Sequence, residues 1–140
     1  MVTGISILLF SVFLLLSIFH MYWSLGGRWG KDDAVPARSD NRKVFVPGRL
    51  LTFIIALGLL ATGFFLLLAA GFWYLPVAPS FYKRGIWMIA VIFLARAVGD
   101  FKYTGFFKTV TDTRFGKKDT KYYTPLSFMI GLLAIVLAIL

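Results

Sequence analysis

The sequence predicts an all-α membrane protein, a bundle of four transmembrane helices with both termini outside the cytoplasm. Three observations predict this fold class. Hydrophobic residues make up 59% of the 140-residue chain and charged residues only 15%, a balance that the surface of a water-soluble protein does not tolerate. The apolar residues gather in four runs, each long enough or nearly long enough to cross about 30 Å of hydrocarbon. The basic residues lie mainly in two of the loops between those runs.

The four runs define the expected helices of a single integral membrane domain, 1–140. We expect them at about 3–25, 49–74, 84–103 and 124–140. The first is not a secretory signal peptide, because it has no basic n-region, its apolar stretch is too long and no small-residue cleavage site follows it. Aromatic residues flank the ends of the runs, as in the interfacial belts of membrane proteins.

The loop charges predict the orientation of the bundle. The loops at about 26–48 and 104–123 hold most of the Lys and Arg residues, whereas the loop between the second and third helices holds only Lys83 and Arg84. By the positive-inside rule, the two basic loops are expected in the cytoplasm. Both termini and the short loop then lie on the opposite side of a cytoplasmic membrane, which agrees with an even number of helices.

The net charge of +9 does not indicate a nucleic-acid-binding protein. The basic residues flank membrane segments, and no nucleic-acid-binding motif accompanies them. We therefore expect membrane lipids as partners, with other membrane proteins or a second copy of the chain as further candidates, and no nucleic acid. The chain has no cysteine and one histidine, so we expect no metal site and no cofactor.

Small residues recur at helical spacing on two of the expected helices. Gly58 and Thr62 make a notch on the second helix, and four small residues share one face of the fourth: Ser127, Gly131, Ala134 and Ala138. Small residues let transmembrane helices approach closely. We expect both faces to pack on neighbouring helices.

A charged pair interrupts the third apolar run near its cytoplasmic end. Arg96 and Asp100 lie four residues apart, so they share one face of a helix and are expected to form an ion pair. A charged side chain in hydrocarbon costs about 2.5–3.5 kcal/mol, and such side chains usually face a bundle interior. His20 lies at a similar depth in the first helix. We expect a stripe formed by Ser17, His20 and Ser24 to face a stripe formed by Arg96, Asp100 and Tyr103.

These residues predict a polar pocket that opens to the cytoplasmic leaflet. In this hypothesis Arg96 binds an anionic group, Asp100 orients the arginine, and His20 exchanges protons near neutral pH. Four aromatic residues are candidate wall residues: Tyr22, Trp23, Tyr103 and Tyr122. The alternative is structural: Arg96 extends to the lipid headgroups, Asp100 satisfies its charge, and His20 hydrogen-bonds a backbone carbonyl.

Four segments carry a family resemblance: "FHMYWSLGGRWG" (19–30), "RAVGDF" (96–101), "GFFK" (105–108) and "TRFGKKDTKYYTPL" (113–126). In these segments the chain resembles the small bacterial four-helix membrane proteins of the DUF3995 family, whose function is unknown. The resemblance implies the fold, a bacterial origin and a location in the inner membrane. It implies no activity.

The leading functional hypothesis is a protein that binds an anionic small molecule or a lipid headgroup in this pocket. An accessory subunit of a larger membrane complex is an alternative, since the chain has small-residue faces and no soluble domain. A lipid-modifying enzyme, with His20 and Asp100 as acid and base, lacks a recognisable nucleophile. A small transporter lacks an acidic residue near the membrane midplane. Whether the protein is an enzyme stays open at this point.

Overall fold

The computed structural model describes all 140 residues and contains helices but no strands. Four helices are long: α1 (Val2–Ser24), α3 (Arg49–Ala69), α4 (Pro79–Val98) and α6 (Thr124–Ile139). The short α2 (Lys31–Ala34) lies in the first loop. The short α5 (Arg114–Lys118) and a π-helical turn, η1 (Asp119–Tyr123), lead directly into α6. The predicted all-α class is confirmed.

Three helices are long and apolar enough to cross a membrane, namely α1, α3 and the continuous helix Arg114–Ile139 that α5, η1 and α6 form together. They indicate a membrane protein. The fourth long helix, α4, has 20 residues but carries Lys83, Arg84 and Arg96. It therefore falls outside this group by composition rather than by length.

The boundaries of α3 and α4 differ from the expected ones. The second helix, expected to reach about residue 74, ends at Ala69, because Gly71 adopts a left-handed φ of +83°. The N–H groups of Gly71 and Phe72 donate to carbonyls of the last helical turn, at 3.0 and 3.2 Å, as in a Schellman ending. The aromatic residues that extended the prediction to 74 belong to the loop.

The third helix was expected at about 84–103 but runs from Pro79 to Val98. Proline favours the first turn of a helix because its missing N–H has no partner there. Gly99, with a φ of +85°, ends the helix. Asp100 and Tyr103 therefore lie beyond α4 and not on one of its faces.

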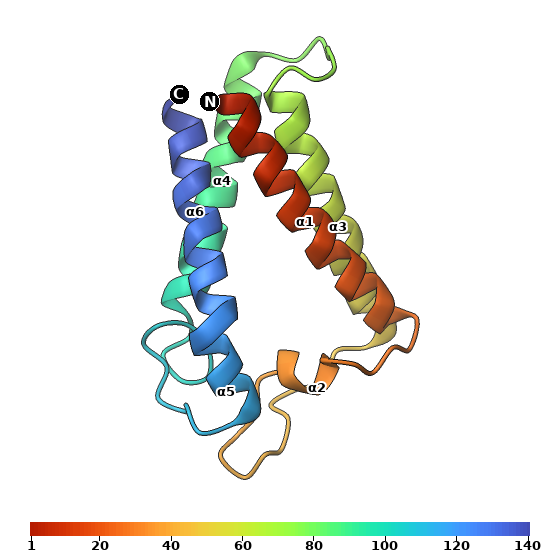
Figure 1. Cartoon of the computed structure of the whole chain (residues 1–140), viewed down its shortest axis with the longest axis vertical. Helices are drawn as coiled ribbons and strands as arrows, with labels where there is room; N and C mark the ends of the chain where they lie inside the picture. Colours follow the sequence, from red (N-terminus) through yellow and green to blue (C-terminus); the bar gives the residue numbers. More distant parts are fainter.

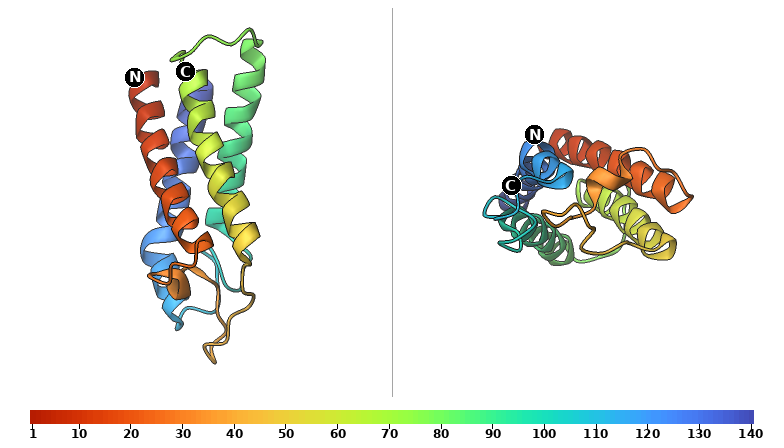
Figure 2. Two further views of the ribbon diagram at one scale, coloured as in Figure 1. Left: turned by 90° about the vertical axis from the view of Figure 1, so that its right-hand side faces the viewer. Right: turned by 90° about the horizontal axis from the view of Figure 1, so that it is seen from below.

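The long helices form two pairs, α1 with α3 and α4 with α6. Figure 1 shows that the pairs lie close together at the end that holds both termini and diverge toward the other end, where α2 lies between them. Figure 2 shows the same bundle from the side and from below. We call the half of the bundle near the termini the closed half and the half near α2 the open half. The apolar core lies in the closed half and consists of ten residues: Leu9, Phe13, Leu66, Ile86, Ile89, Ala90, Ile130, Ala134, Leu137 and Ala138. Near mid-length, Phe13 packs edge to face on Phe93, with 5.4 Å between the ring centres.

The small-residue face of α6 packs as predicted, since Ser127, Gly131, Ala134 and Ala138 are all buried. A Cβ atom at Gly131 would lie 2.6 Å from Cγ of Leu94 on α4. The packing predicted for the Gly58 notch of α3 is wrong within this chain, because a Cβ atom there would meet nothing within 4 Å. Gly63 instead makes the close approach, to Phe10 and Phe13 of α1.

Candidate functional site

The open half of the bundle contains a buried carboxylate, that of Asp119, the first residue of η1. Its side chain is fully buried. Nη2 of Arg96 lies 2.6 Å from Oδ1 and Nζ of Lys108 lies 3.0 Å from Oδ2. The hydroxyl of Thr124 and the N–H of Gly105 also donate to Oδ2, at 2.8 and 3.0 Å. One carboxylate thus ties together α4, the loop after it and the start of α6.

The charges of this cluster do not cancel. Two cations meet one carboxylate, and the Lys108 side chain is only 3% exposed, whereas that of Arg96 is 34% exposed. In addition, Nη1 of Arg96 is buried without a hydrogen-bond partner, an unusual condition for a buried donor. The cluster of Arg96, Lys108 and Asp119 therefore carries one excess positive charge and one unfilled donor.

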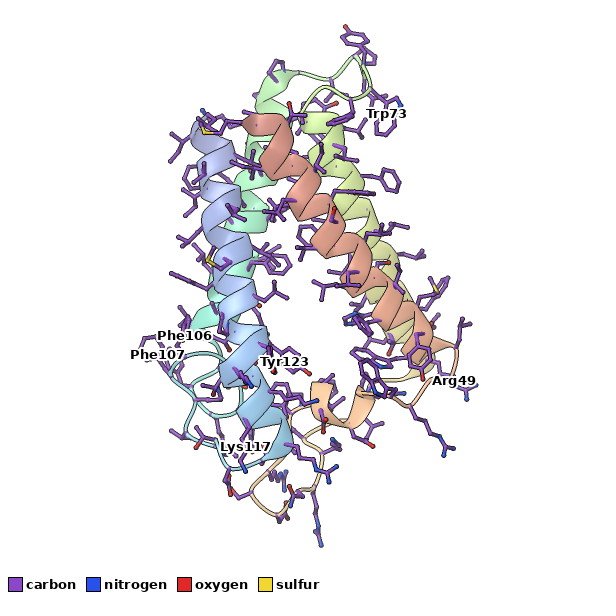
Figure 3. The ribbon with its side chains drawn as sticks, in the orientation of Figure 1. Arg49, Trp73, Phe106, Phe107, Lys117 and Tyr123 are labelled. Carbon is purple, nitrogen blue, oxygen red and sulfur yellow. The ribbon has the colours of Figure 1, made fainter.

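The loop segment 105–108 has two faces. Phe106 and Phe107 are exposed and extend outward from the base of α4 and α6 (Figure 3). Lys108 instead turns inward, where its Nζ also donates to the carbonyl of Gly105 at 3.0 Å. This segment therefore supplies apolar side chains to the surroundings and a cation to Asp119.

The predicted ion pair between Arg96 and Asp100 is wrong, because Arg96 pairs with Asp119. Asp100 lies past the end of α4, and its Oδ1 accepts hydrogen bonds from the N–H groups of Lys102, Tyr103 and Thr104 at 3.0, 2.7 and 2.9 Å. Partial burial raises the pKa of the Asp100 carboxyl, but these backbone donors outweigh it and hold the pKa below its ordinary value. Asp100 therefore organises the loop and does not orient Arg96.

A cavity of about 320 Å³ lies between the two helix pairs in the open half. All the helical segments, α1 to α6 and η1, contribute residues to its walls, and most of these residues are apolar. The lining residues are Leu16, His20, Trp23, Ala34, Ile55, Leu59, Phe93, Arg96, Phe115, Tyr123, Leu126, Ser127 and Ile130. A neighbouring hollow of about 260 Å³ shares four of them: His20, Trp23, Ala34 and Ile55. The structure thus brings His20 and Arg96, from two separate helices, to one cavity.

His20 is oriented by its own helix. Its Nδ1 lies 2.7 Å from the carbonyl oxygen of Leu16, and since a carbonyl only accepts, Nδ1 carries a proton. The ring packs edge to face on Trp23, at 5.1 Å between ring centres. Ser17, expected on the same stripe, instead donates to the carbonyl of Ala56 on α3 at 2.7 Å and joins α1 to α3.

The other predicted wall residues lie away from this cavity. Tyr22 covers the turn at Gly27, and its hydroxyl accepts from the N–H of Trp29 at 3.4 Å. Tyr103 lines a separate hollow among the loops. Tyr122 is exposed, beside Lys121. Of the seven candidate residues, His20, Trp23 and Arg96 line the cavity.

The first loop covers the open end of the cavity through α2. Lys118 donates to Asp33 across a gap of 2.8 Å, which holds α2 against α5. The hydrogen bond from Lys118 is the main reason that the pKa of Asp33 lies below its ordinary value. Ala34, the next residue of α2, lines both hollows. This ion pair therefore joins the two diverging helix pairs at the end where they are farthest apart.

Three residues of the site escaped the sequence analysis: Lys108, Asp119 and Tyr123. Their segment was predicted to be a basic cytoplasmic loop at about 104–123, whereas residues from 114 onward are helical. A signal was present, since Phe115, Asp119, Tyr123 and Ser127 recur at every fourth position and continue the inner face of α6. Figure 3 shows Tyr123 on the side of this helix that faces α1 and α3.

Comparison with known proteins identifies the family but no activity. A family model described as a protein of unknown function, DUF3995, matches residues 13–134. This range includes His20, Arg96, Lys108 and Asp119. No curated protein and no solved structure matches the chain. The family match covers most of the sequence and agrees with the resemblance of its motifs, so the chain belongs to the DUF3995 family.

Proposed function

We propose that the protein binds the anionic headgroup of a lipid in the cavity between its helix pairs, at the cytoplasmic leaflet of a bacterial inner membrane. The observation that carries this proposal is the excess positive charge of the Arg96, Lys108 and Asp119 cluster beside an apolar cavity. A buried charge without a counterion is costly. An anionic group at Arg96 would balance it and supply a partner for Nη1.

The composition of the cavity walls favours an amphiphile over a purely polar anion as the ligand. Its walls toward the closed half are apolar side chains of four helices, such as Leu59 and Ile130. Its polar side chains are few: His20, Arg96, Tyr123 and Ser127. The Ser127 hydroxyl already donates to the carbonyl of Tyr123 at 2.9 Å. A phosphate group would pair with Arg96, and an acyl chain would pack along the apolar walls. Ligand sites generally combine apolar walls with a few polar groups in this way.

The proposal includes a membrane topology in which all four long helices cross the bilayer. With 20 residues, α4 is about 30 Å long, which matches the hydrocarbon thickness. Its cations lie toward its two ends, and Arg96 is paired with Asp119. Because α4 packs along α6, we expect α4 to cross the membrane together with α6. The basic loops then face the cytoplasm, and both termini lie outside.

The topology can be tested by cysteine labelling, since the chain contains no cysteine of its own. We expect single cysteines at Ser39 and Lys117, both exposed loop or helix-end positions, to react with a membrane-impermeant maleimide only after the inner membrane is opened. A cysteine at Ser80, an exposed residue in the first turn of α4 at the opposite end of the bundle, should react in intact spheroplasts. Labelling of position 39 or 117 in intact spheroplasts would contradict the topology.

The binding proposal predicts that the affinity for a lipid depends on both its headgroup charge and Arg96. In detergent, dioctanoyl phosphatidic acid is expected to bind the wild type more tightly than dioctanoylglycerol, which lacks the phosphate, or glycerol 3-phosphate, which lacks the chains. Arg96→Gln should weaken phosphatidic acid binding by about 10- to 100-fold, the range for a charge-assisted hydrogen bond, and leave dioctanoylglycerol binding unchanged. Isothermal titration calorimetry measures all three ligands.

A second variant keeps the charged cluster intact and fills the cavity. Ile55→Trp places a larger side chain at a position that lines both hollows, and it should reduce phosphatidic acid binding. Ile54→Trp is the matched control, because Ile54 is exposed and lines neither hollow. Equal binding of phosphatidic acid and dioctanoylglycerol, or equal effects of the two tryptophans, would refute the proposal. Binding of glycerol 3-phosphate as tightly as the lipid would instead identify a soluble anion as the ligand.

A further inference from the structure

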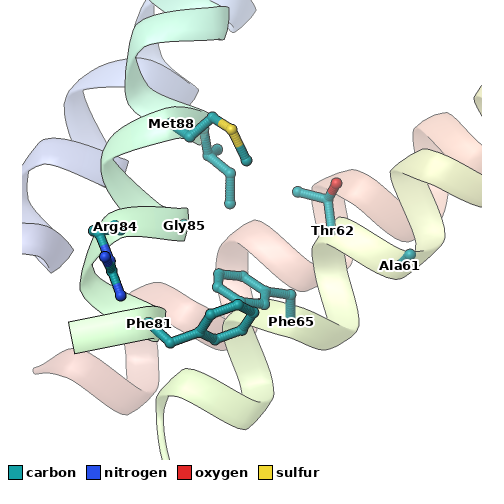
Figure 4. A pocket seen from close by; sticks show the side chains of 8 residues that line it. Ala61, Thr62, Phe65, Phe81, Arg84, Gly85 and Met88 are labelled. Atoms are coloured by element: carbon teal, nitrogen blue, oxygen red, sulfur yellow. The ribbon is translucent and has the colours of Figure 1, made fainter. Parts of the chain in front are cut away.

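A further hollow, of about 570 Å³, lies between α3 and α4 in the half of the bundle nearer the termini. Thr62 and Phe65 of α3 form one wall, and Phe81, Arg84 and Met88 of α4 form the other (Figure 4). It shares no residue with the cavity at Arg96. We call this hollow the outer groove, and it is separate from the cavity at Arg96.

The walls of the outer groove suit an acyl chain. The rings of Phe65 and Phe81 meet edge to face, with 6.0 Å between their centres. The Thr62 hydroxyl donates within its own helix, to the carbonyl of Gly58 at 2.8 Å, so it offers no unpaired donor. Gly85 leaves room for the Phe65 ring, since a Cβ atom there would lie 2.7 Å from Cε1 of that ring. Apart from Arg84, the groove presents apolar surface.

The groove is lined by one cation without an ionic partner, Arg84. Arg84 is exposed, and its Nε donates to the carbonyl of Ser80 at 3.2 Å. Neither terminal nitrogen of Arg84 makes a hydrogen bond or an ion pair, and neighbouring Lys83 has no ion pair. All acidic side chains of the protein lie at the other end of the bundle: Asp32, Asp33, Asp40, Asp100, Asp112 and Asp119. Two cations thus stand at this end without any carboxylate side chain to balance them.

We propose that the outer groove binds an anionic phospholipid of the leaflet opposite the one that serves the Arg96 cavity. The phosphate pairs with Arg84, whose planar guanidinium suits a phosphate diester, and one acyl chain runs along Phe65 and Met88. Arg84 lies five residues into α4, about 8 Å along the helix from Pro79, at a depth that headgroups reach. The surrounding bilayer supplies phospholipid at all times. A partner helix would need its own carboxylate at this level, and the test includes that outcome.

The test measures retention of dioleoyl phosphatidylglycerol, with dioleoyl phosphatidylcholine as competitor, by native mass spectrometry of the protein in detergent. Measurements in the Ile55→Trp background remove the contribution of the other cavity, so that failure of one proposal does not imply failure of the other. Arg84→Gln should weaken phosphatidylglycerol retention about tenfold. Arg28→Gln is the control, because Arg28 is also exposed and unpaired but lies at the opposite end.

Filling the groove gives an independent test without any change of charge. Ala61, an exposed residue of α3, lines the groove, and Ala61→Trp should displace the acyl chain and reduce retention as strongly as Arg84→Gln. Leu57→Trp, also on the exposed surface of α3 but outside the groove, should retain the lipid. Unchanged retention in Arg84→Gln or in Ala61→Trp would overturn the proposal. So would the loss of a copurifying protein from Arg84→Gln with lipid retention unchanged, because the occupant would then be a protein.

Discussion

Replacement of Asp119 by alanine is expected to destabilise the protein by about 3–5 kcal/mol, the cost of breaking a buried ion pair by removing one partner. The change leaves Lys108 almost fully buried and Arg96 partly buried without their common counterion. It also removes the acceptor for Thr124 and for the N–H of Gly105. Unfolding by sodium dodecyl sulfate in mixed micelles, followed by far-ultraviolet circular dichroism, measures the change in stability.

Asp112→Ala provides the matched control, because Asp112 is an exposed aspartate with no ion pair in the structure. Its replacement should change stability by less than about 0.5 kcal/mol. A second comparison separates charge from packing. Adding Lys108→Met to Asp119→Ala should restore part of the lost stability, since it removes an uncompensated buried charge. If the second change lowers stability further by the amount it costs in the wild type, the two residues are not coupled.

The helical content was predictable because it depends on local apolar patterning. The membrane excludes unpaired backbone groups, so long apolar runs form helices regardless of their detailed sequence. The ends were less predictable. Gly71 and Gly99 stop α3 and α4 before the apolar and aromatic residues run out. Pro79 starts α4 ahead of the cations that had been taken as its boundary. Backbone conformation at single glycines and prolines decided these positions.

The partner of Arg96 could not be found from spacing within one helix. Asp100 stands at the correct interval only if the helix continues, and Gly99 ends it. The actual partner, Asp119, is 23 residues away and becomes available because the chain folds back through the loop between α4 and α5. The equal depth of two polar residues in two apolar helices led us to expect His20 and Arg96 near each other, and both residues line one hollow. The predicted depth of a residue changes little when a helix boundary is wrong by a few residues. A prediction that two residues share one helix face fails when the helix ends between them.

The loop that brings Asp119 to Arg96 depends on an interlocked pair of glycines, Gly99 and Gly105. A Cβ atom at Gly105 would overlap the carbonyl oxygen of Val98 and lie 2.5 Å from Cα of Gly99. These are backbone atoms, which cannot turn aside as a side chain can. Gly105 also adopts a φ of +88° and donates its N–H to Asp119 at 3.0 Å. Gly105→Ala is therefore expected to strain the backbone, displace the loop and weaken the buried cluster at once.

Gly71 allows these effects to be separated, because it has nearly the same φ, +83°, but a Cβ atom there would meet nothing within 4 Å. Gly71→Ala should cost only the left-handed backbone penalty of about 1–2 kcal/mol. Gly105→Ala should cost that amount plus about 1–3 kcal/mol for the steric overlap, a total on the order of 3 kcal/mol or more by the same unfolding assay. It should also weaken phosphatidic acid binding, which Gly71→Ala should leave unchanged, because only Gly105 helps to hold Asp119 beside Arg96. Equal losses of stability in the two variants would show that the loop can yield at Gly105, and that the glycine does not lock the chain around the buried carboxylate.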